Sequence, residues 1–233
     1  FEVPAGKTAA ALDAARALGL VGLSVTMPHK TDAARACDSL SDAARRLHSV
    51  NTVTPQPGGT LRGDSTDGPG FVRSLRDAGC DPARTPTLVL GAGGAARPVV
   101  VALAEEGAQV TVTARRPDAA TAAAALVDGA TVPWIERDAA ARDAALVVNA
   151  TPVGMGDGAL PIPATALRAG QVVADLVYHP LETPLLAAAR AAGATTVDGL
   201  GMLVHQAALQ IEQWSGHAAP VATMREAVRE VLS

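Results

Sequence analysis

The chain has 233 residues, a formal net charge of −4 and a hydrophobic content of 48%, enough for one large domain or two small ones with a sizeable core. Only 2% of the residues are aromatic, which argues against modules that stack nucleic-acid bases on exposed rings. Charges of both signs are interspersed and form no basic stretch, so we expect neither a nucleic acid nor an anionic membrane as a partner.

The cysteine and histidine usage indicates a reducing compartment and no metal centre. Cys37 and Cys80 lack a CxxC or Cys/His companion, and we interpret them as small hydrophobic residues. None of the histidines has metal-ligand spacing with another ligand, so no metal is expected. No apolar run approaches the roughly 20 residues that cross a bilayer, and no secretion signal is apparent. We therefore expect a cytoplasmic protein.

The first third of the chain predicts short helices and strands. A helix over Thr8–Leu18 ends before Gly19, a residue type favoured just past a helix end. The segments that follow predict a strand at Val21–Thr26, helices at Thr31–Ala36 and Ser39–Leu47, and a hairpin of Val50–Thr54 and Thr60–Arg62 around Pro57-Gly58-Gly59.

The rest of the chain predicts a helix at Gly68–Gly79, a linker at Asp81–Pro86, and then strands that alternate with helices. The predicted strands are Thr87–Gly91, Gln109–Thr113, Thr131–Trp134, Ala145–Ala150, Val172–Tyr178 and Thr195–Asp198, and the tail predicts helices at Met202–Trp214 and Val221–Leu232. Such alternation is typical of a parallel, doubly wound α/β sheet. We expect the flanking segments to combine into a second domain.

A glycine-rich turn indicates a dinucleotide site. The predicted strand that ends near Leu90 is followed by Gly91, Ala92, Gly93, Gly94, Ala95 and Ala96, and then by a helical stretch, Val99–Glu106. Backbone N–H groups at the start of such a helix can approach a pyrophosphate with no Cβ in the way. The alternative is a plain glycine-rich turn, which the surrounding strand–helix–strand pattern disfavours.

The end of the next strand selects the cofactor. NAD-selective folds place a carboxylate there for the ribose 2′-hydroxyl, but this chain has Arg115 and Arg116. Two guanidinium groups suit the 2′-phosphate of NADP, both by bidentate hydrogen bonding and by stacking on adenine. The alternative is a solvated strand end without a ligand.

A third candidate cofactor segment is Asn149-Ala150-Thr151, which ends another parallel strand. Ligands of such sheets lie outside the carboxyl ends of the strands, so this small-residue turn can pass beside the ribose and nicotinamide. A tight turn with no ligand is the alternative.

The residues themselves give a weaker indication of the chemistry. Hydride transfer at a carbinol needs a group that moves the hydroxyl proton. Lys30 is predicted to open a helix, where the dipole favours a neutral amine that can act as a base. By type alone, however, it is a solvated lysine, Asp67 is a turn or N-cap residue, and Asn51 is a strand-edge residue.

Taken together, these segments resemble the shikimate dehydrogenase family. The matching blocks occur in fixed order over essentially the whole chain, and they include the glycine turn, Ser24–Lys30, Val50–Thr52, Ser65–Gly68, Asn149–Thr151, Asp175–Pro180, Thr183–Leu185 and Gly199–Ala208. The resemblance implies an oxidoreductase that uses NADPH to reduce 3-dehydroshikimate to shikimate, in aromatic amino-acid biosynthesis through the chorismate pathway.

The resemblance also implies the roles of individual residues. Lys30 and Asp67 would be the catalytic pair, with Lys30 passing a proton to the substrate oxygen and Asp67 holding Lys30 and a substrate hydroxyl in place. Substrate binding would involve Thr26, Asn51, Tyr178 and Gln206, and further cofactor contacts would come from Gly199 and Met202.

The expected architecture is α/β with two domains. Residues 67–198 would form a Rossmann-like NADP-binding domain, and residues 1–66 with 199–233 an α/β substrate-binding domain. The family's first strand and serine loop would precede Phe1, so we expect an N-terminally incomplete chain. Two alternatives stay open: a paralogue acting on quinate or aminoshikimate, and an NADP-binding remnant without turnover. The expected partner is a small-molecule substrate, and the protein is expected to be a monomer or homodimer.

Overall fold

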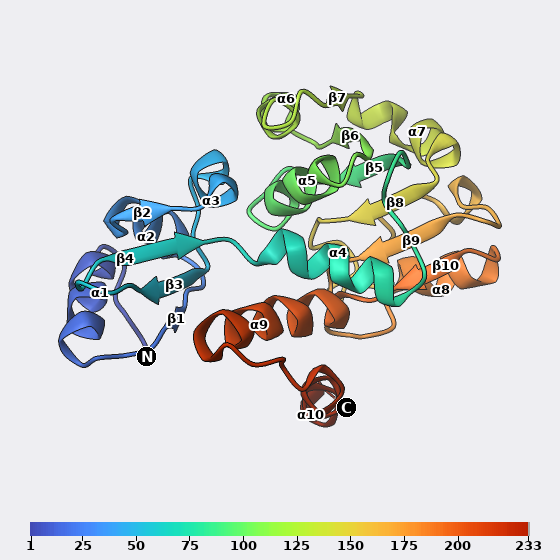
Figure 1. Ribbon diagram of the computed structural model, residues 1–233. Helices are drawn as coiled ribbons and strands as arrows, with labels where there is room; N and C mark the ends of the chain where they lie inside the picture. Colours follow the sequence, from blue (N-terminus) through green and yellow to red (C-terminus); the bar gives the residue numbers. More distant parts are fainter. Residues whose placement is uncertain (233) are drawn as a thin grey trace. The chain divides into compact units, whose positions relative to one another are not determined.

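The computed structural model describes residues 1–232, which divide into two compact units (Figure 1). The first unit comprises Phe1–Asp67 and Gln206–Ala219, and the second comprises Gly68–His205 and the chain from Pro220 onward. Helix α9 (Gly199–Ser215) therefore begins in the second unit and ends in the first. The assignment of substrate- and cofactor-binding roles to separate domains stays a prediction.

The first unit is built on a four-stranded sheet of order β1-β3-β4-β2. β3 pairs antiparallel with both β1 and β4, whereas β2 runs parallel to β4. The predicted hairpin is confirmed as β3 and β4. The elements in chain order are α1 (Thr8–Ala17), β1 (Leu23–Ser24), α2 (Lys30–Ala36), β2 (Ser39–Leu40), α3 (Asp42–Leu47), β3 (Thr52–Pro55) and β4 (Leu61–Asp64).

The core of this unit is aliphatic, as the low aromatic content requires. Its buried residues come from α1, α2, α3 and the hairpin, and they are Leu12, Ala33, Ala44, Val50, Val53 and Leu61. Alanine on the helices lets these short elements lie close to the sheet. The removal of this apolar surface from water is the main stabilising contribution to the unit.

The predicted helix at Ser39–Leu47 is wrong at its start. Ser39 and Leu40 form strand β2, which pairs with Arg62 and Gly63 of β4. The helix begins only after Ser41, whose hydroxyl accepts a hydrogen bond from the backbone N–H of Ala44 at 3.2 Å. A serine N-cap and a strand partner distant in sequence therefore override the local helical pattern.

The second unit contains a six-stranded parallel sheet of order β10-β9-β8-β5-β6-β7. This is the strand order of a doubly wound fold. From β5 the chain adds β6 and β7 on one side and β8, β9 and β10 on the other, so the strand order changes direction between β5 and β8. The predicted α/β fold class is confirmed. The strands are β5 (Pro86–Leu90), β6 (Gln109–Thr113), β7 (Ala130–Thr131), β8 (Leu146–Asn149), β9 (Val172–Asp175) and β10 (Thr195–Val197).

Helices cover both faces of this sheet and bury a separate core on each. One core joins the sheet to α4 (Asp67–Asp77), α5 (Ala96–Glu105) and α6 (Pro117–Ala124). The other joins it to α7 (Arg137–Asp143) and α8 (Pro184–Ala191). Neighbouring residues of β5 alternate between the cores, with Val89 in the first and Leu88 and Leu90 in the second. The remaining elements are 3-10 turns at Trp134–Glu136 and Ala164–Ala166 and helix α10 (Val221–Leu232).

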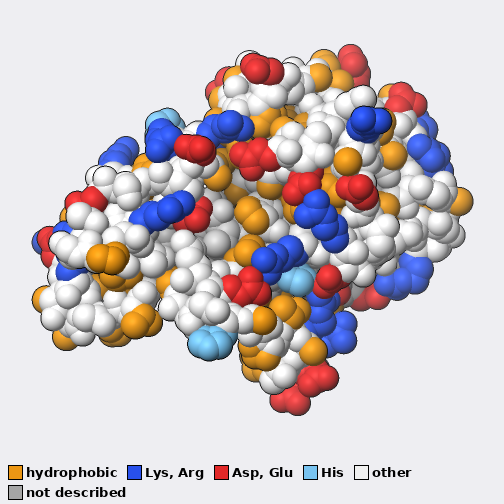
Figure 2. All heavy atoms as spheres, viewed as in Figure 1, with side chains coloured by type: hydrophobic (Ala, Val, Ile, Leu, Met, Phe, Trp, Pro, Cys, Tyr) orange, Lys and Arg blue, Asp and Glu red, His pale blue; other side chains and the backbone are white. Residues whose placement is uncertain are grey.

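The surface charges and the two cysteines are arranged as the sequence predicts. Figure 2 shows acidic and basic side chains interspersed over the visible face. Cys37 and Cys80 are both free thiols. Burial raises the pKa of the Cys37 thiol to about 11, and burial likewise raises the pKa of Cys80. Both therefore act as small hydrophobic groups and not as reactive thiolates near neutral pH.

Gly68 sets how closely α4 and α5 can pack. A Cβ at this position would overlap the carbonyl oxygen of Pro98 and lie 2.7 Å from the Cβ of Ala102. Because backbone cannot yield as a flexible side chain does, any larger residue here must push the helices apart.

We predict that Gly68→Ala lowers the free energy of unfolding by about 1–3 kcal/mol. Gly94→Ala is the matched control, because a Cβ at Gly94 would meet nothing within 4 Å and should change stability by less than about 0.5 kcal/mol. Urea denaturation of the two variants beside the wild type measures both values. Equal stability of Gly68→Ala and Gly94→Ala would contradict the close approach.

Candidate active site

The glycine turn follows β5, where the strand order of the sheet changes direction between β5 and β8. Gly91 follows β5 with φ of 109°, a conformation that strains any residue with a side chain. A Cβ on Gly91 would also lie 2.8 Å from the carbonyl oxygen of Ala150, so the turn after β8 passes directly beside it. By contrast, a Cβ on Gly93 or Gly94 would meet nothing within 4 Å. The last two glycines thus leave open space above the start of α5.

A groove of about 710 Å³ extends from this turn along the carboxyl ends of the strands. Most of the residues predicted to contact the cofactor line it, and the full lining is Gly91, Ala92, Gly93, Ala114, Arg115, Arg116, Ala119, Trp134, Ala150, Thr151, Pro152, Val153 and Asp157. Gly94 and Ala95 complete the turn, with Ala95 at the N-cap of α5. Arg115 and Arg116 are exposed directly after β6. The groove therefore has backbone unobstructed by side chains at the glycine turn and two guanidinium groups at the end of β6.

Asn149 is predicted to contact the cofactor, but in this structure its fully buried amide shapes the wall of the groove. Its Nδ2 donates to Asp175 Oδ1 at 2.9 Å and to the carbonyl of Val153 at 3.1 Å. Its Oδ1 accepts from the hydroxyl of Thr151 at 2.7 Å and from the N–H of Thr151 at 3.1 Å. Asn149 thereby ties the turn after β8 to the end of β9. A direct cofactor contact of Asn149 stays a prediction.

Asp175, at the end of β9, lies behind the groove as a partner of Asn149 and was not among the predicted site residues. Its carboxyl accepts from Thr183 Oγ1 at 2.7 Å, from the N–H of Val177 at 3.0 Å and from Asn149. Burial raises the pKa of Asp175, and these three hydrogen bonds oppose the shift. Its place at the carboxyl end of a parallel strand is the sequence signal that could have identified it.

Two residues that line the groove lie outside the strands and α-helices. The predicted strand at Thr131–Trp134 is wrong at its end, because β7 stops at Thr131. Trp134 begins a 3-10 turn, and the guanidinium of Arg137 lies over its ring at 4.7 Å from the centroid. Asp157 accepts from the N–H groups of Ala159 and Gly154 at 3.1 and 2.9 Å, which holds the pKa of that carboxyl below its usual range. The glycines around Asp157 were the only signal of a tight loop.

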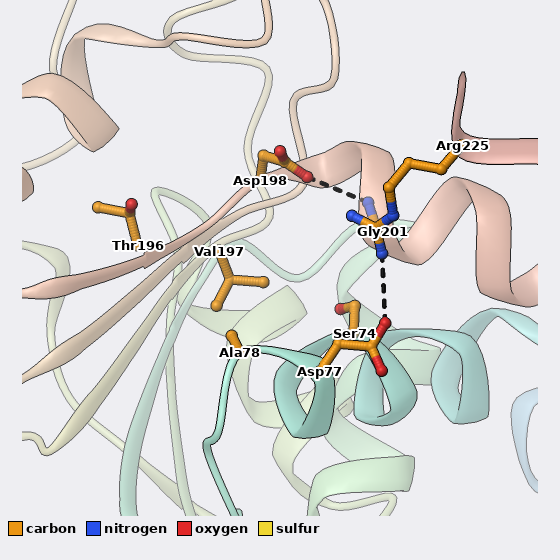
Figure 3. Close-up of a pocket in the computed structure, with 8 residues that line it drawn as sticks. All are labelled: Ser74, Asp77, Ala78, Thr196, Val197, Asp198, Gly201 and Arg225. Atoms are coloured by element: carbon orange, nitrogen blue, oxygen red, sulfur yellow. Dashed lines mark hydrogen bonds and ion pairs between the residues drawn. The ribbon is translucent and has the colours of Figure 1, made fainter. Parts of the chain in front are cut away.

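The start of α9 carries Gly199 and Met202, and it is held by side chains that line a second cavity of about 360 Å³ in the same unit (Figure 3). Asp198 Oδ1 accepts from the N–H of Gly201 at 3.1 Å and caps the helix. A Cβ on Gly201 would lie 2.7 Å from the Cβ of Ser74 on α4. Arg225 of α10 also lines the cavity, where it forms an ion pair with Asp77 at 3.3 Å.

The first unit contains a compact polar cluster. Lys30, the first residue of α2, places Nζ 2.7 Å from Oδ2 of Asp67, the first residue of α4. The Lys30 and Asp67 side chains are 28% and 14% exposed, so the pair is shielded but reachable from solvent. The other carboxyl oxygen of Asp67 accepts from Asn51 Nδ2 at 2.8 Å. A lysine side chain held by a charge-assisted hydrogen bond in this way can donate a proton as the ammonium and take one back as the amine.

Asn51 joins the other members of this cluster. Its side chain is almost fully buried, and its Nδ2 also lies 3.0 Å from Thr66 Oγ1 and 3.4 Å from Gln206 Oε1. Lys30, Asn51, Asp67 and Gln206 are therefore brought together as one group.

The other two predicted substrate contacts are not part of this hydrogen-bonded group. Thr26 is exposed in the first unit, and its carbonyl accepts from the N–H of His29 at 3.0 Å. Tyr178 belongs to the second unit, where its side chain is 44% exposed. Their predicted roles in substrate binding stay predictions.

Two absences complete the description of the site and its surroundings. Within residues 1–232, no group of three or more His, Cys, Asp or Glu side chains is arranged to hold a metal ion. Over the same residues, no helix is long and apolar enough to cross a membrane.

Comparison with known proteins finds family models and close relatives. The model of the shikimate dehydrogenase substrate binding domain matches residues 1–53, and that of the shikimate 5'-dehydrogenase C-terminal domain matches residues 199–229. A shikimate dehydrogenase (NADP(+)) of Acidiphilium cryptum is 48% identical over 209 residues, which cover 89% of this chain and 75% of the relative.

Solved structures give the same result. Shikimate 5-dehydrogenase of Thermus thermophilus, in complex with NADP(H) and shikimate, is 39% identical with a TM-score of 0.91, and the match covers 100% of this chain and 87% of that one. Quinate dehydrogenase of Corynebacterium glutamicum, in complex with NAD, is 34% identical with a TM-score of 0.90 over 95% of this chain and 82% of that one.

A doubly wound parallel sheet with a glycine turn where the strand order changes direction is typical of the class of α/β proteins that bind a dinucleotide. Within that class, the chain belongs to the shikimate dehydrogenase family. The family resemblance expected from the sequence motifs is therefore confirmed.

The raised pKa of Asp175 predicts a pH dependence of stability. An unfolded aspartate releases its proton near pH 4, whereas the folded protein keeps that proton to a higher pH. Folded protein binds the extra proton only in this window, so the free energy of unfolding falls as the pH rises from about 4 through the folded-state pKa of Asp175. Asp175→Asn mimics the protonated carboxyl and should remove this fall.

Urea midpoints of wild type and Asp175→Asn between about pH 4 and 7 measure the effect. Asp143→Asn, which neutralises an exposed carboxylate, is the control and should follow the wild type. A constant difference between wild type and Asp175→Asn across this range would show that burial does not hold the proton.

Proposed function

We propose that this chain is an NADP-dependent shikimate dehydrogenase, which interconverts 3-dehydroshikimate and shikimate in aromatic amino-acid biosynthesis. The observation that carries the proposal is its identity to curated NADP-dependent shikimate dehydrogenases over most of its length. The groove of the second unit and the Lys30–Asp67 pair of the first supply the two groups of residues that such a reaction needs.

The residues of the groove fit NADP. Gly93 and Gly94 leave open space where any side chain would project, which suits the close approach of a pyrophosphate to backbone N–H groups at the start of α5. Arg115 and Arg116 would hold the 2′-phosphate, because the end of β6 carries no carboxylate to repel it. Further contacts would come from Gly91, Ala92, Ala95, Asn149, Ala150, Thr151, Gly199 and Met202. NADPH, when bound, supplies the hydride.

Lys30 and Asp67 would move the accompanying proton. In the reducing direction Lys30 donates a proton from Nζ to the carbonyl oxygen of the substrate, and in the oxidising direction it takes that proton back. Asp67 holds the ammonium through the 2.7 Å contact and so keeps the donor in place. Asn51, Gln206, Thr26 and Tyr178 would bind the hydroxyls and carboxylate of the substrate. A polyol acid needs this many polar partners because each unpaired buried group costs about 1–3 kcal/mol.

We also propose a cellular location and an oligomeric state for the protein. The two free thiols support a cytoplasmic location. We expect a monomer or a homodimer with a small-molecule substrate. Shikimate is favoured over quinate because curated shikimate dehydrogenases reach 48% identity to this chain, against 34% for the quinate dehydrogenase. Arg115 and Arg116 favour NADP.

We predict that Lys30→Met and Asp67→Asn each lower kcat by about 100- to 10,000-fold, because each removes part of the proton-transfer pair. The measurement is the formation of NADPH from NADP⁺ with shikimate, and in parallel with quinate. Lys7→Met is the control: Lys7 is the chain's other lysine, and its side chain is exposed.

Near-normal turnover in Lys30→Met would refute the proton-transfer role of Lys30. Wild-type protein that binds NADP but turns over neither shikimate nor quinate would refute the proposed reaction. Faster turnover of quinate than of shikimate would instead favour the quinate paralogue.

The combined variant Arg115→Gln/Arg116→Gln tests the cofactor preference. We predict that it raises the KM for NADP⁺ by at least about tenfold, since charge-assisted contacts to the 2′-phosphate are lost, while the KM for NAD⁺ changes much less. Arg229→Gln removes an exposed arginine of α10 and should leave both values unchanged. Equal changes for NADP⁺ and NAD⁺ would mean that the two arginines do not read the 2′-phosphate.

A further inference from the structure

Gln210 is a buried polar residue that the proposed reaction does not use. It lies on α9 in the first unit, and its side chain is 2% exposed. Its Nε2 donates to the backbone carbonyl of Asn51 at 3.1 Å and to the hydroxyl of Thr52 at 3.0 Å. A buried amide is costly unless it is hydrogen-bonded, so these two contacts define what the residue does.

The hydrogen bonds around Asn51 have a fixed direction. The backbone N–H of Thr66 can only donate, and it reaches Asn51 Oδ1 at 2.8 Å. The hydroxyl of Thr52 donates to the same oxygen at 2.8 Å. The Thr66 contact requires oxygen at this position and the Thr52 contact is compatible with it, so the Nδ2 of Asn51 must face Asp67.

Gln210 completes this order. With its single hydroxyl proton directed toward Asn51, the oxygen of Thr52 can only accept further hydrogen bonds, and it accepts one from Gln210. The hydroxyl of Thr66, at 3.1 Å from the same oxygen, can be a second donor. The carbonyl of Asn51 is held from two sides, by the N–H of Val25 at 2.7 Å and by Gln210. Donation therefore runs one way, from Gln210 through Thr52 and Asn51 to the carboxylate of Asp67.

We propose that Gln210 is a positioning residue, which orients the Asn51 amide and through it the Asp67 carboxylate that holds Lys30. The role rests on the proposed function, because it acts on the Lys30–Asp67 pair. An apolar residue at this position would fill the space but would remove one donor from the Asn51 carbonyl, which would keep the N–H of Val25, and the Gln210 donor from the Thr52 hydroxyl. The Thr52 hydroxyl could then turn away from Asn51, and the Asn51 amide would lose one of the contacts that fix its orientation.

The primary test is Gln210→Met, which keeps the volume of the side chain and removes both N–H donors. Gln213→Met is the matched control, because Gln213 is an exposed glutamine on the same helix. We expect Gln210→Met to lower kcat for shikimate by about 10- to 100-fold, the range that displaced catalytic groups produce. The KM for NADP⁺ should stay within about twofold of wild type, and Gln213→Met should leave both constants unchanged.

A double-mutant cycle with Thr52→Val separates positioning from general packing. If Gln210 acts through Thr52, the double variant should lose no more activity than the more affected single variant. Should Gln210→Met not fold, Thr52→Val carries the test alone, and it must show the same loss of kcat at unchanged KM for NADP⁺.

A readout independent of turnover is the side-chain NH₂ of Asn51 in nitrogen–proton correlation NMR spectra of the whole chain. Gln210→Met should shift these resonances and speed their exchange with water, whereas Gln213→Met should not. Because this readout needs no substrate, it distinguishes failure of this inference from failure of the proposed reaction. Wild-type kcat in folded Gln210→Met, additive losses in the cycle, or unchanged Asn51 resonances would each overturn the positioning role.

Discussion

The orientation of one buried amide determines the arrangement of the proposed catalytic pair. Asn51 presents oxygen to the N–H of Thr66 and the hydroxyl of Thr52, and it can then present only nitrogen to Asp67. A flipped amide would set two lone pairs against the carboxylate and two N–H groups against a donor. The cost of that mismatch in a buried site leaves a single low-energy arrangement, and the Asp67 contact to Lys30 follows from it.

The cofactor groove depends on a different constraint, which is space. At Gly91 the backbone of the next turn leaves no room for a Cβ, whereas at Gly93 and Gly94 the space is open. The first glycine is thus required by the fold itself, and the other two by the ligand we propose. Behind the groove, Asn149 and Asp175 join the ends of β8 and β9, so the wall is shaped by buried hydrogen bonds while the contact surface is mostly backbone and small side chains.

Sequence reasoning reached the features that local patterns encode. The parallel sheet, the glycine turn and the arginines after β6 all follow from periodicity and from residues adjacent in the chain. It failed where a distant partner decides the structure: Ser39 and Leu40 become a strand only because β4 offers them an edge. Gln210 was missed for a related reason, since only the folded chain shows what a buried amide contacts. Asp175 was missed although its place at the carboxyl end of a parallel strand was a signal. Lys30 and Asp67 are individually ordinary residues, and the family resemblance, not their spacing, singled them out.

The scarcity of lysine has a chemical consequence. Arginine supplies nearly all of the positive charge, and Lys7 and Lys30 are the only side-chain primary amines of the chain. Arginine does not lose its proton and resists acylation, so amine-directed reagents have very few targets on this surface. One of those targets is Lys30, whose side chain is partly exposed beside Asp67. An amine-directed electrophile would thus find two lysine targets on this chain, the exposed Lys7 and the Lys30 of the proposed site, where a lysine-rich protein would offer many.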